Sequence, residues 1–128
     1  MDWTIEEVRK AFNGRLMGSL QMRKMVCQTL LHLPSEIIEQ VTKNVWFLSS
    51  PDDAWAFTFR GSDIKGQHLI VLSDDLFNQD QSQITYTILH EIGHVLLGHK
   101  NSVGYQQTQS EVKRQELEAD LFASKYTP

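Results

Sequence analysis

The sequence predicts an α+β fold, and three observations support this class. Thr4 followed by Glu7 matches a helix-capping box, after which hydrophobic residues recur at helical spacing. Three short apolar segments then follow between residues 45 and 73. Two amphipathic helical segments occupy residues 82–126. Helices set apart from one small sheet are typical of the α+β class.

The N-terminal part, residues 1–44, is expected to be helical. The hydrophobic residues that recur at helical spacing are Ile5, Val8, Phe12, Leu16 and Leu20. We expect helices from about residue 4 to 32, weakened in the middle by Gly14 and Gly18. A short further helix is expected after Pro34, with Ser35 as its cap.

The middle of the chain, residues 45–73, is expected to form the sheet. Its apolar segments are residues 45–48, 55–59 and 68–72, separated by turn-forming residues. Trp55, Phe57 and Phe59 alternate with smaller residues, which predicts one buried face. We therefore expect a small, mainly antiparallel, three-stranded sheet.

The last two helices are delimited by their flanking residues. Asp80 can cap a helix over about residues 82–97, and Gly98 is placed to end it. A final helix is expected over about residues 110–125. The polar segment between the two helices, residues 100–109, is expected to be a loop.

Length and composition narrow the classes of function. A chain of 128 residues is expected to form one domain, residues 1–128. The formal net charge is -4 and the basic residues are scattered, so direct nucleic-acid binding is not expected. Cys27 is the only cysteine, which excludes an internal disulfide and a cysteine-rich zinc site. Neither a signal peptide nor an apolar run of ~20 residues is found, so we expect a cytoplasmic protein without a membrane partner.

Residues 90–94 read HEIGH, a spacing typical of zinc sites in hydrolases. On a helix, His90 and His94 are ~40° apart in projection and ~6 Å apart along the axis, so both can bind one ion. Glu91 lies at ~100°, where it can take a proton from a metal-bound water without being a ligand. Two imidazoles and a carboxylate suit zinc. The motif predicts one Zn2+ per chain and a zinc peptidase with Glu91 as the base.

A third ligand is expected from the final helix. Glu116 shares one helix face with Asp120 and with two small residues, Ala119 and Ala123, whereas Glu118 points to the far side. We therefore predict Glu116 as the ligand. Asp120, one turn later, is expected to accept a hydrogen bond from the outer N–H of a metal-bound histidine.

Other histidines and tyrosines offer weaker alternatives. His99 does not match the spacing of a third histidine ligand in the metzincins, and we interpret it as a rim or solvent histidine, with contact to the substrate as the alternative. A hydrogen-bond donor to the oxyanion is also needed. Tyr105, Tyr126 and His99 are candidates that the sequence does not rank.

Residues 90–99 and 116–123, with the closing Pro128, resemble the ImmA/IrrE metallopeptidases. With the preceding strands, the resemblance extends over about two thirds of the chain. It implies a zincin-like core of the gluzincin type, present here as a minimal catalytic core. It also implies His90, His94 and Glu116 as zinc ligands and Glu91 as the catalytic base, with Asp120 at a position where the family often has Asn.

The resemblance further implies a zinc endopeptidase whose protein substrate is a helix-turn-helix transcriptional repressor. We expect the substrate to lie extended along an exposed edge strand at residues 69–72. A second hypothesis is a zinc-bearing regulatory module that sequesters a protein partner without cleaving it. A third is a latent peptidase whose site is blocked by residues 1–30 or by the loop at residues 100–109.

Overall fold

The N-terminal part of the chain forms three helices and one short strand. The computed structural model describes residues 3–50, 56–64, 67–98 and 108–128. These first elements are α1 (Ile5–Phe12), β1 (Leu16–Met17), α2 (Leu20–Leu30) and α3 (Ser35–Asn44). The predicted capping box is confirmed, because Thr4 Oγ1 accepts a hydrogen bond from the Glu7 amide and the Glu7 carboxylate accepts one from the Thr4 amide.

The expected weak point in the first helical stretch is a complete break. Asn13 and Gly14 have φ angles of 50° and 88°, in the left-handed region that ends a helix. After β1, Ser19 begins a new helix by accepting a hydrogen bond from the Met22 amide. Two separate helices therefore stand where one interrupted stretch was expected.

The predicted cap of α3 is wrong. The N-cap residue is Pro34, and no side chain caps this helix. Ser35 is already the first helical residue, and its hydroxyl accepts a hydrogen bond of 2.9 Å from the indole N–H of Trp3. That contact ties the start of α3 to the N-terminal segment.

The sheet contains four strands in the described part of the chain, in the order β1-β2-β4-β3. The three longer strands are β2 (Val45–Ser50), β3 (Ala56–Ile64) and β4 (Gln67–Ser73). Two pairings are parallel, β1 with β2 and β2 with β4, and only β3 with β4 is antiparallel. The α+β class is confirmed, but the expected mainly antiparallel three-stranded sheet is wrong. The reason is that β2 does not pair with β3, its neighbour in sequence, so only one hairpin forms.

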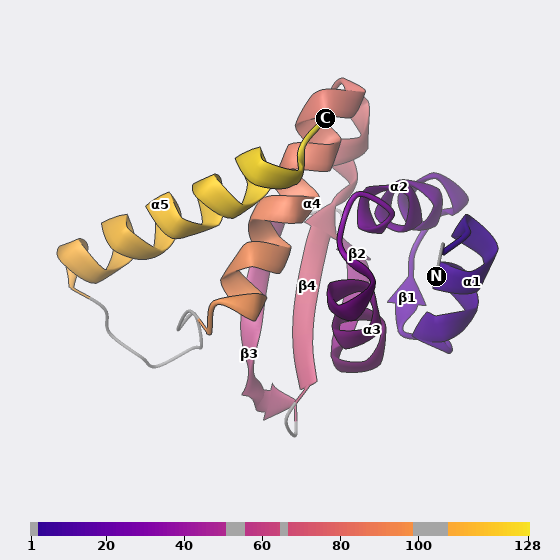
Figure 1. Cartoon of the computed structure of the whole chain (residues 1–128), viewed down its shortest axis with the longest axis horizontal. Helices are drawn as coiled ribbons and strands as arrows, with labels where there is room; N and C mark the ends of the chain where they lie inside the picture. Colours follow the sequence, from indigo (N-terminus) through magenta and orange to yellow (C-terminus); the bar gives the residue numbers. More distant parts are fainter. Residues whose placement is uncertain (1–2, 51–55, 65–66, 99–107) are drawn as a thin grey trace.

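This strand order also places the free edge of the sheet at a different strand from the one expected. Strand β4 lies between β2 and β3, so residues 69–72 have a strand on both sides and are not an exposed edge. The expectation of an edge at β4 is therefore wrong. The outer strand on this side is β3 (Figure 1). The alternation expected for residues 55–59 concerns side chains that lie outside the described part of the structure.

Two long helices complete the fold, as predicted. α4 (Gln81–Leu96) follows the short 3-10 helix η1 (Asp74–Asn78), and the Asp80 carboxylate caps it by accepting from the Gln83 amide at 2.8 Å. Gly98, with a φ of 69°, follows its last turn. α5 (Gln109–Tyr126) begins with a second capping box, formed by Thr108 and Glu111.

The hydrophobic core fixes which side of α4 faces the sheet. Its buried residues from α4 are Ile84, Ile88, Leu89 and Ile92, and they share one cluster with Phe47 and Ile70 of the sheet. The histidine side of α4 therefore faces away from the sheet, and α5 packs against this helix (Figure 1).

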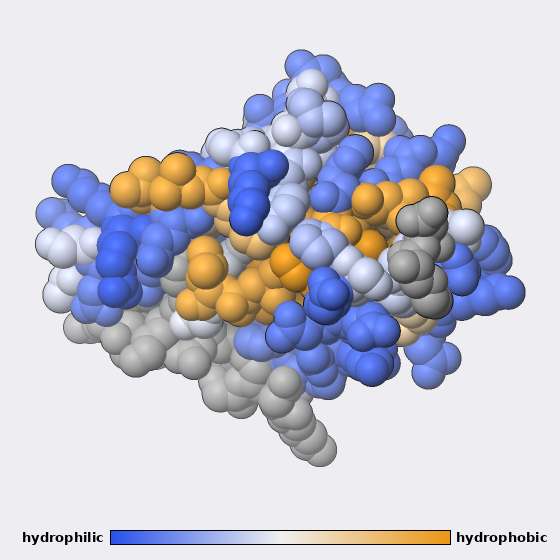
Figure 2. Space-filling view, in the orientation of Figure 1, coloured by the Kyte–Doolittle hydropathy of each residue, from blue (hydrophilic) through white to orange (hydrophobic). Residues whose placement is uncertain are grey.

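The outer side of α5 carries exposed hydrophobic residues. Leu117 and Leu121 are 59% and 62% exposed and lie one turn apart, and Figure 2 shows hydrophobic surface over α5. Among the described residues, no helix is both long enough and apolar enough to cross a membrane.

Candidate metal centre

Two helices bring three potential metal ligands together. His90 and His94 lie one turn apart on α4, and Glu116 lies on α5. One ligand atom from each of the three residues lies within 4.8 Å of the others. The residues that the motif and the helix projection predicted as neighbours are therefore adjacent, and this group could hold a metal ion.

The carboxylate of Glu116 bridges the two histidines. Its Oε2 lies 3.1 Å from Nε2 of His90, and its Oε1 lies 3.2 Å from Nε2 of His94. The two imidazole rings meet edge to face, with centroids 4.7 Å apart and an interplanar angle of 86°. Both Nε2 atoms therefore point to one side of α4, toward the same carboxylate.

Glu91 is the buried carboxylate of this region. It is 8% exposed, and its Oε1 lies 3.7 Å from Nδ1 of His90. The Glu91 carboxylate is the main reason that the pKa of His90 is raised. Glu116 and Asp120 act in the same direction, while burial opposes them. His90 thus lies among three acidic groups, an arrangement that attracts positive charge.

Asp120 contacts His90, but at a different nitrogen from the one expected. Its Oδ1 lies 3.3 Å from Nε2 of His90, the nitrogen that also faces Glu116. The expected partner of Asp120 was the outer N–H of a metal-bound histidine, which is Nδ1 in a histidine that binds its metal through Nε2. Asp120 is therefore on the same side of the imidazole as the candidate ligand Glu116.

Tyr86 is a member of this network that the sequence argument missed. Its hydroxyl donates a hydrogen bond of 2.6 Å to Oδ1 of Asp120. The bond to the Asp120 carboxylate raises the pKa of Tyr86 to about 12, so the phenol remains a donor at neutral pH. The signal was available, since Tyr86 precedes His90 by four residues and lies on the same helix face.

Close packing of α4 on α5 sets these distances. A Cβ added at Gly93, between the two histidines, would lie 3.1 Å from Cδ1 and 3.2 Å from Cβ of Phe122. Ala119 and Ala123 of α5 are fully buried. Small residues on both helices thus allow α5 to approach α4 closely enough to bring Glu116 to the histidines.

The remaining candidates do not join this group. Glu118 is not one of the three clustered residues. His99 and Tyr105 lie outside the described residues. Tyr126 packs against Phe122, with ring centroids 5.1 Å apart. Because Tyr126 is ten residues beyond Glu116 on α5, it lies ~15 Å away along the helix axis.

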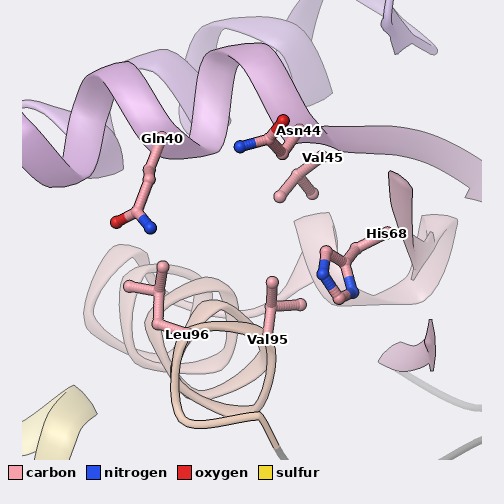
Figure 3. Close-up of a pocket in the computed structure, with 6 residues that line it drawn as sticks. All are labelled: Gln40, Asn44, Val45, His68, Val95 and Leu96. Atoms are coloured by element: carbon pink, nitrogen blue, oxygen red, sulfur yellow. The ribbon is translucent and has the colours of Figure 1, made fainter. Parts of the chain in front are cut away.

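A cavity of about 250 Å³ lies on the other side of α4, between this helix and α3 (Figure 3). It is lined by Gln40, Asn44, Val45, His68, Val95 and Leu96. None of the three clustered residues contributes to it. The cavity is therefore separate from the candidate metal group formed by His90, His94 and Glu116.

Comparison with known proteins supports a peptidase. The Peptidase U49 family model matches residues 52–127, more than half of the chain, and this range contains every residue of the candidate centre. The matched family is not the ImmA/IrrE family that the motifs resemble. No curated protein and no solved structure matched the chain. The chain belongs to the Peptidase U49 family.

Proposed function

We propose that this protein is a zinc-dependent endopeptidase of the HExxH, gluzincin type, acting on a protein substrate. The observation that carries the proposal is the group formed by His90, His94 and Glu116, with the buried carboxylate of Glu91 beside it. In the proposal, the first three residues hold one zinc ion and Glu91 is the catalytic base. The membership of a peptidase family supports the reaction type.

The chemistry of the donor atoms fits zinc. Two imidazole nitrogens and a carboxylate oxygen are a donor set that catalytic zinc sites use. Each Glu116 oxygen faces one histidine Nε2, at 3.1 and 3.2 Å, and one ligand atom from each of the three residues lies within 4.8 Å of the others, so the group can converge on one ion. A zinc ion held by His90, His94 and Glu116 would supply Lewis-acid chemistry, lowering the pKa of a water molecule toward ~7 and polarising the scissile carbonyl.

Glu91 is placed to move the proton in the proposed reaction. Its carboxylate takes a proton from the attacking water as the new bond to the peptide carbonyl carbon forms. The same carboxyl group then gives this proton to the leaving nitrogen as the C–N bond breaks. The products are a carboxylate and a protonated amine, which receives the second proton of the water as well, and the Glu91 carboxylate is regenerated. Burial of Glu91 beside His90 keeps it next to the histidine face of α4.

Tyr86 and Asp120 support the geometry in this proposal. The 2.6 Å hydrogen bond from Tyr86 fixes the Asp120 carboxylate beside Nε2 of His90. Held there, Asp120 adds negative charge next to the ligand set without being one of the three ligands. We assign Tyr86 and Asp120 positioning roles.

The corrected sheet order suggests where the substrate binds. Strand β3 pairs with β4 on one side only, and no other described strand pairs with it. It is the outer strand on the side of the molecule toward which α5 extends (Figure 1). An extended peptide can pair with such an edge through its backbone, so we propose β3, in place of residues 69–72, as the strand that binds substrate.

The proposal extends to partner and location only through the ImmA/IrrE resemblance. On that basis we propose a helix-turn-helix repressor as the first substrate to test, and the cytoplasm as the place of action. Residues 90–94 and Glu116 carry this resemblance.

The test combines metal content with cleavage. Zinc-loaded protein is incubated with the repressor-like proteins encoded nearest to it, beside the Glu91→Gln variant and a Glu118→Gln control. We expect fragments from the wild type and from Glu118→Gln, and none from Glu91→Gln, although all three retain zinc. A stable complex with intact partner in every sample would instead establish the non-cleaving binding module. Fragments from Glu91→Gln would refute the role of Glu91.

A further inference from the structure

A groove runs between α1 and α2, well separated in sequence from the candidate metal centre. It encloses about 330 Å³ and is lined by Ile5, Glu6, Arg9, Leu20, Arg23, Lys24 and Cys27. None of these residues belongs to the metal group, and all of them precede the range matched by the peptidase family. The groove is therefore a feature of the N-terminal helices, separate from the catalytic proposal.

The groove presents apolar surface to solvent. Leu20, the first residue of α2, is 75% exposed, and Ile5, the first residue of α1, is 37% exposed. Cys27, in contrast, is 1% exposed. Figure 2 shows hydrophobic surface over α2 among hydrophilic side chains. An apolar side chain from a partner would bury this surface.

The rim of the groove is basic. Arg9, Arg23 and Lys24 line it, against one acidic residue, Glu6, which is already paired with Arg9. The buried Nε of Arg23 has no hydrogen-bond partner among the described residues. A carboxylate bound at this rim would meet Arg23 and Lys24, two cations that Glu6 does not neutralise.

The positive charge is local, because the whole chain is acidic. Residues 3–31 contain five basic residues and two acidic ones, whereas the whole chain contains 12 basic and 16 acidic residues. Such a basic segment in an acidic protein attracts negatively charged partners to one face.

We propose that the α1–α2 groove is a docking site for an acidic amphipathic segment of a partner protein. One apolar side chain of that segment fills the groove between Ile5 and Leu20, and its carboxylates pair with Arg23 and Lys24. The hollow shape favours a peptide over a lipid surface, because membrane binding relies on an apolar face that protrudes into the bilayer. The site holds a partner while the chemistry takes place elsewhere, and it does not depend on the zinc proposal.

The test uses a fluorescein-labelled helical peptide of about 15 residues, with leucines on one face and glutamates on the other. Binding to the full-length protein is measured by fluorescence anisotropy. We expect Leu20→Ser and Lys24→Glu each to weaken binding at least about fivefold, and added salt to weaken it further. Both side chains are exposed, so neither variant should disturb folding.

Matched controls lie on α5. Leu121→Ser removes a leucine that is 62% exposed and Lys113→Glu reverses an exposed charge, and both variants should bind the peptide as the wild type does. A peptide with lysine in place of each glutamate should not bind. Three results would overturn the proposal: no binding of the acidic peptide, equal losses in the α5 controls, or binding of phosphatidylserine-containing vesicles that is lost in the α2 variants while the peptide stays unbound.

Discussion

Tyr86 donates a 2.6 Å hydrogen bond to the Asp120 carboxylate, whose same oxygen lies 3.3 Å from Nε2 of His90. This pair joins α4 to α5 one helical turn away from the contact between His90 and Glu116. The metal group is therefore supported by a second polar contact between the same two helices. We expect this contact to control metal affinity more than folding.

Replacing Tyr86 by Phe removes this hydrogen bond while keeping the ring. Loss of a residue that holds groups next to metal ligands typically lowers metal affinity by one to two orders of magnitude. We expect Tyr86→Phe to weaken zinc binding about tenfold, measured by competition with a chromogenic chelator. Tyr126→Phe, which removes a hydroxyl from a ring packed on Phe122, is the control and should leave affinity unchanged. Equal zinc affinities of the wild type and Tyr86→Phe would show that Tyr86 has no role at the metal site.

Gly93→Ala tests the close contact between α4 and α5. The added methyl would lie 3.2 Å from Cβ of Phe122, an atom that cannot move without its backbone. Overpacking of this kind costs about 1–3 kcal/mol, and the better helix propensity of Ala returns about 1 kcal/mol. We expect a net loss of up to about 2 kcal/mol in urea unfolding of the metal-free protein, together with weaker zinc binding as Glu116 moves away. A more stable variant with unchanged affinity would show that Phe122 accommodates the methyl.

Cys27 provides a pH-dependent test of the core. Burial raises the pKa of the Cys27 thiol from 9.0 to about 11, so the folded state favours the neutral thiol. Below pH 9 the thiol is neutral in both states and the native state has no disadvantage. Between pH 9 and about 11 the unfolded chain loses the proton first, so stability falls by about 1–3 kcal/mol.

This effect is measured by urea unfolding across that pH range, with Cys27→Ala as the control. We expect the control to show a smaller decrease in the free energy of unfolding. Iodoacetamide should also label Cys27 slowly at pH 8, where the native thiolate is scarce, and rapidly in denaturant. Rapid labelling of the native protein would contradict the burial of Cys27.

The two helices of the candidate metal centre were predictable from sequence because local rules determine them. Asp80 and Gly98 mark the ends of α4, and the apolar residues at helical spacing identify its buried side. Projection of the final helix likewise placed Glu116 and Glu118 on different faces of α5. These features depend on residues a few positions apart, and such patterns are readable in one sequence.

The sheet was less predictable because strand order is a long-range property. Nothing in residues 45–50 indicates that they pair in parallel with residues 67–73 and leave the intervening strand outside. Because the strand order differs from the expected one, the strand proposed to bind substrate is β3 and not β4. The hydrogen bond of Tyr86 was not predictable for a different reason. Its partner Asp120 lies 34 positions away, and only a histidine was expected to contact Asp120.

Zinc titration of the metal-free protein tests the central claim most directly. Isothermal calorimetry on the wild type, Glu116→Ala and Glu118→Ala separates the clustered carboxylate from its neighbour on the other face of α5. The account predicts one tightly bound zinc per chain in the wild type and in Glu118→Ala, and a loss of affinity of at least about a hundredfold in Glu116→Ala. Absence of tight zinc binding by the wild type, or unchanged binding by Glu116→Ala, would contradict it.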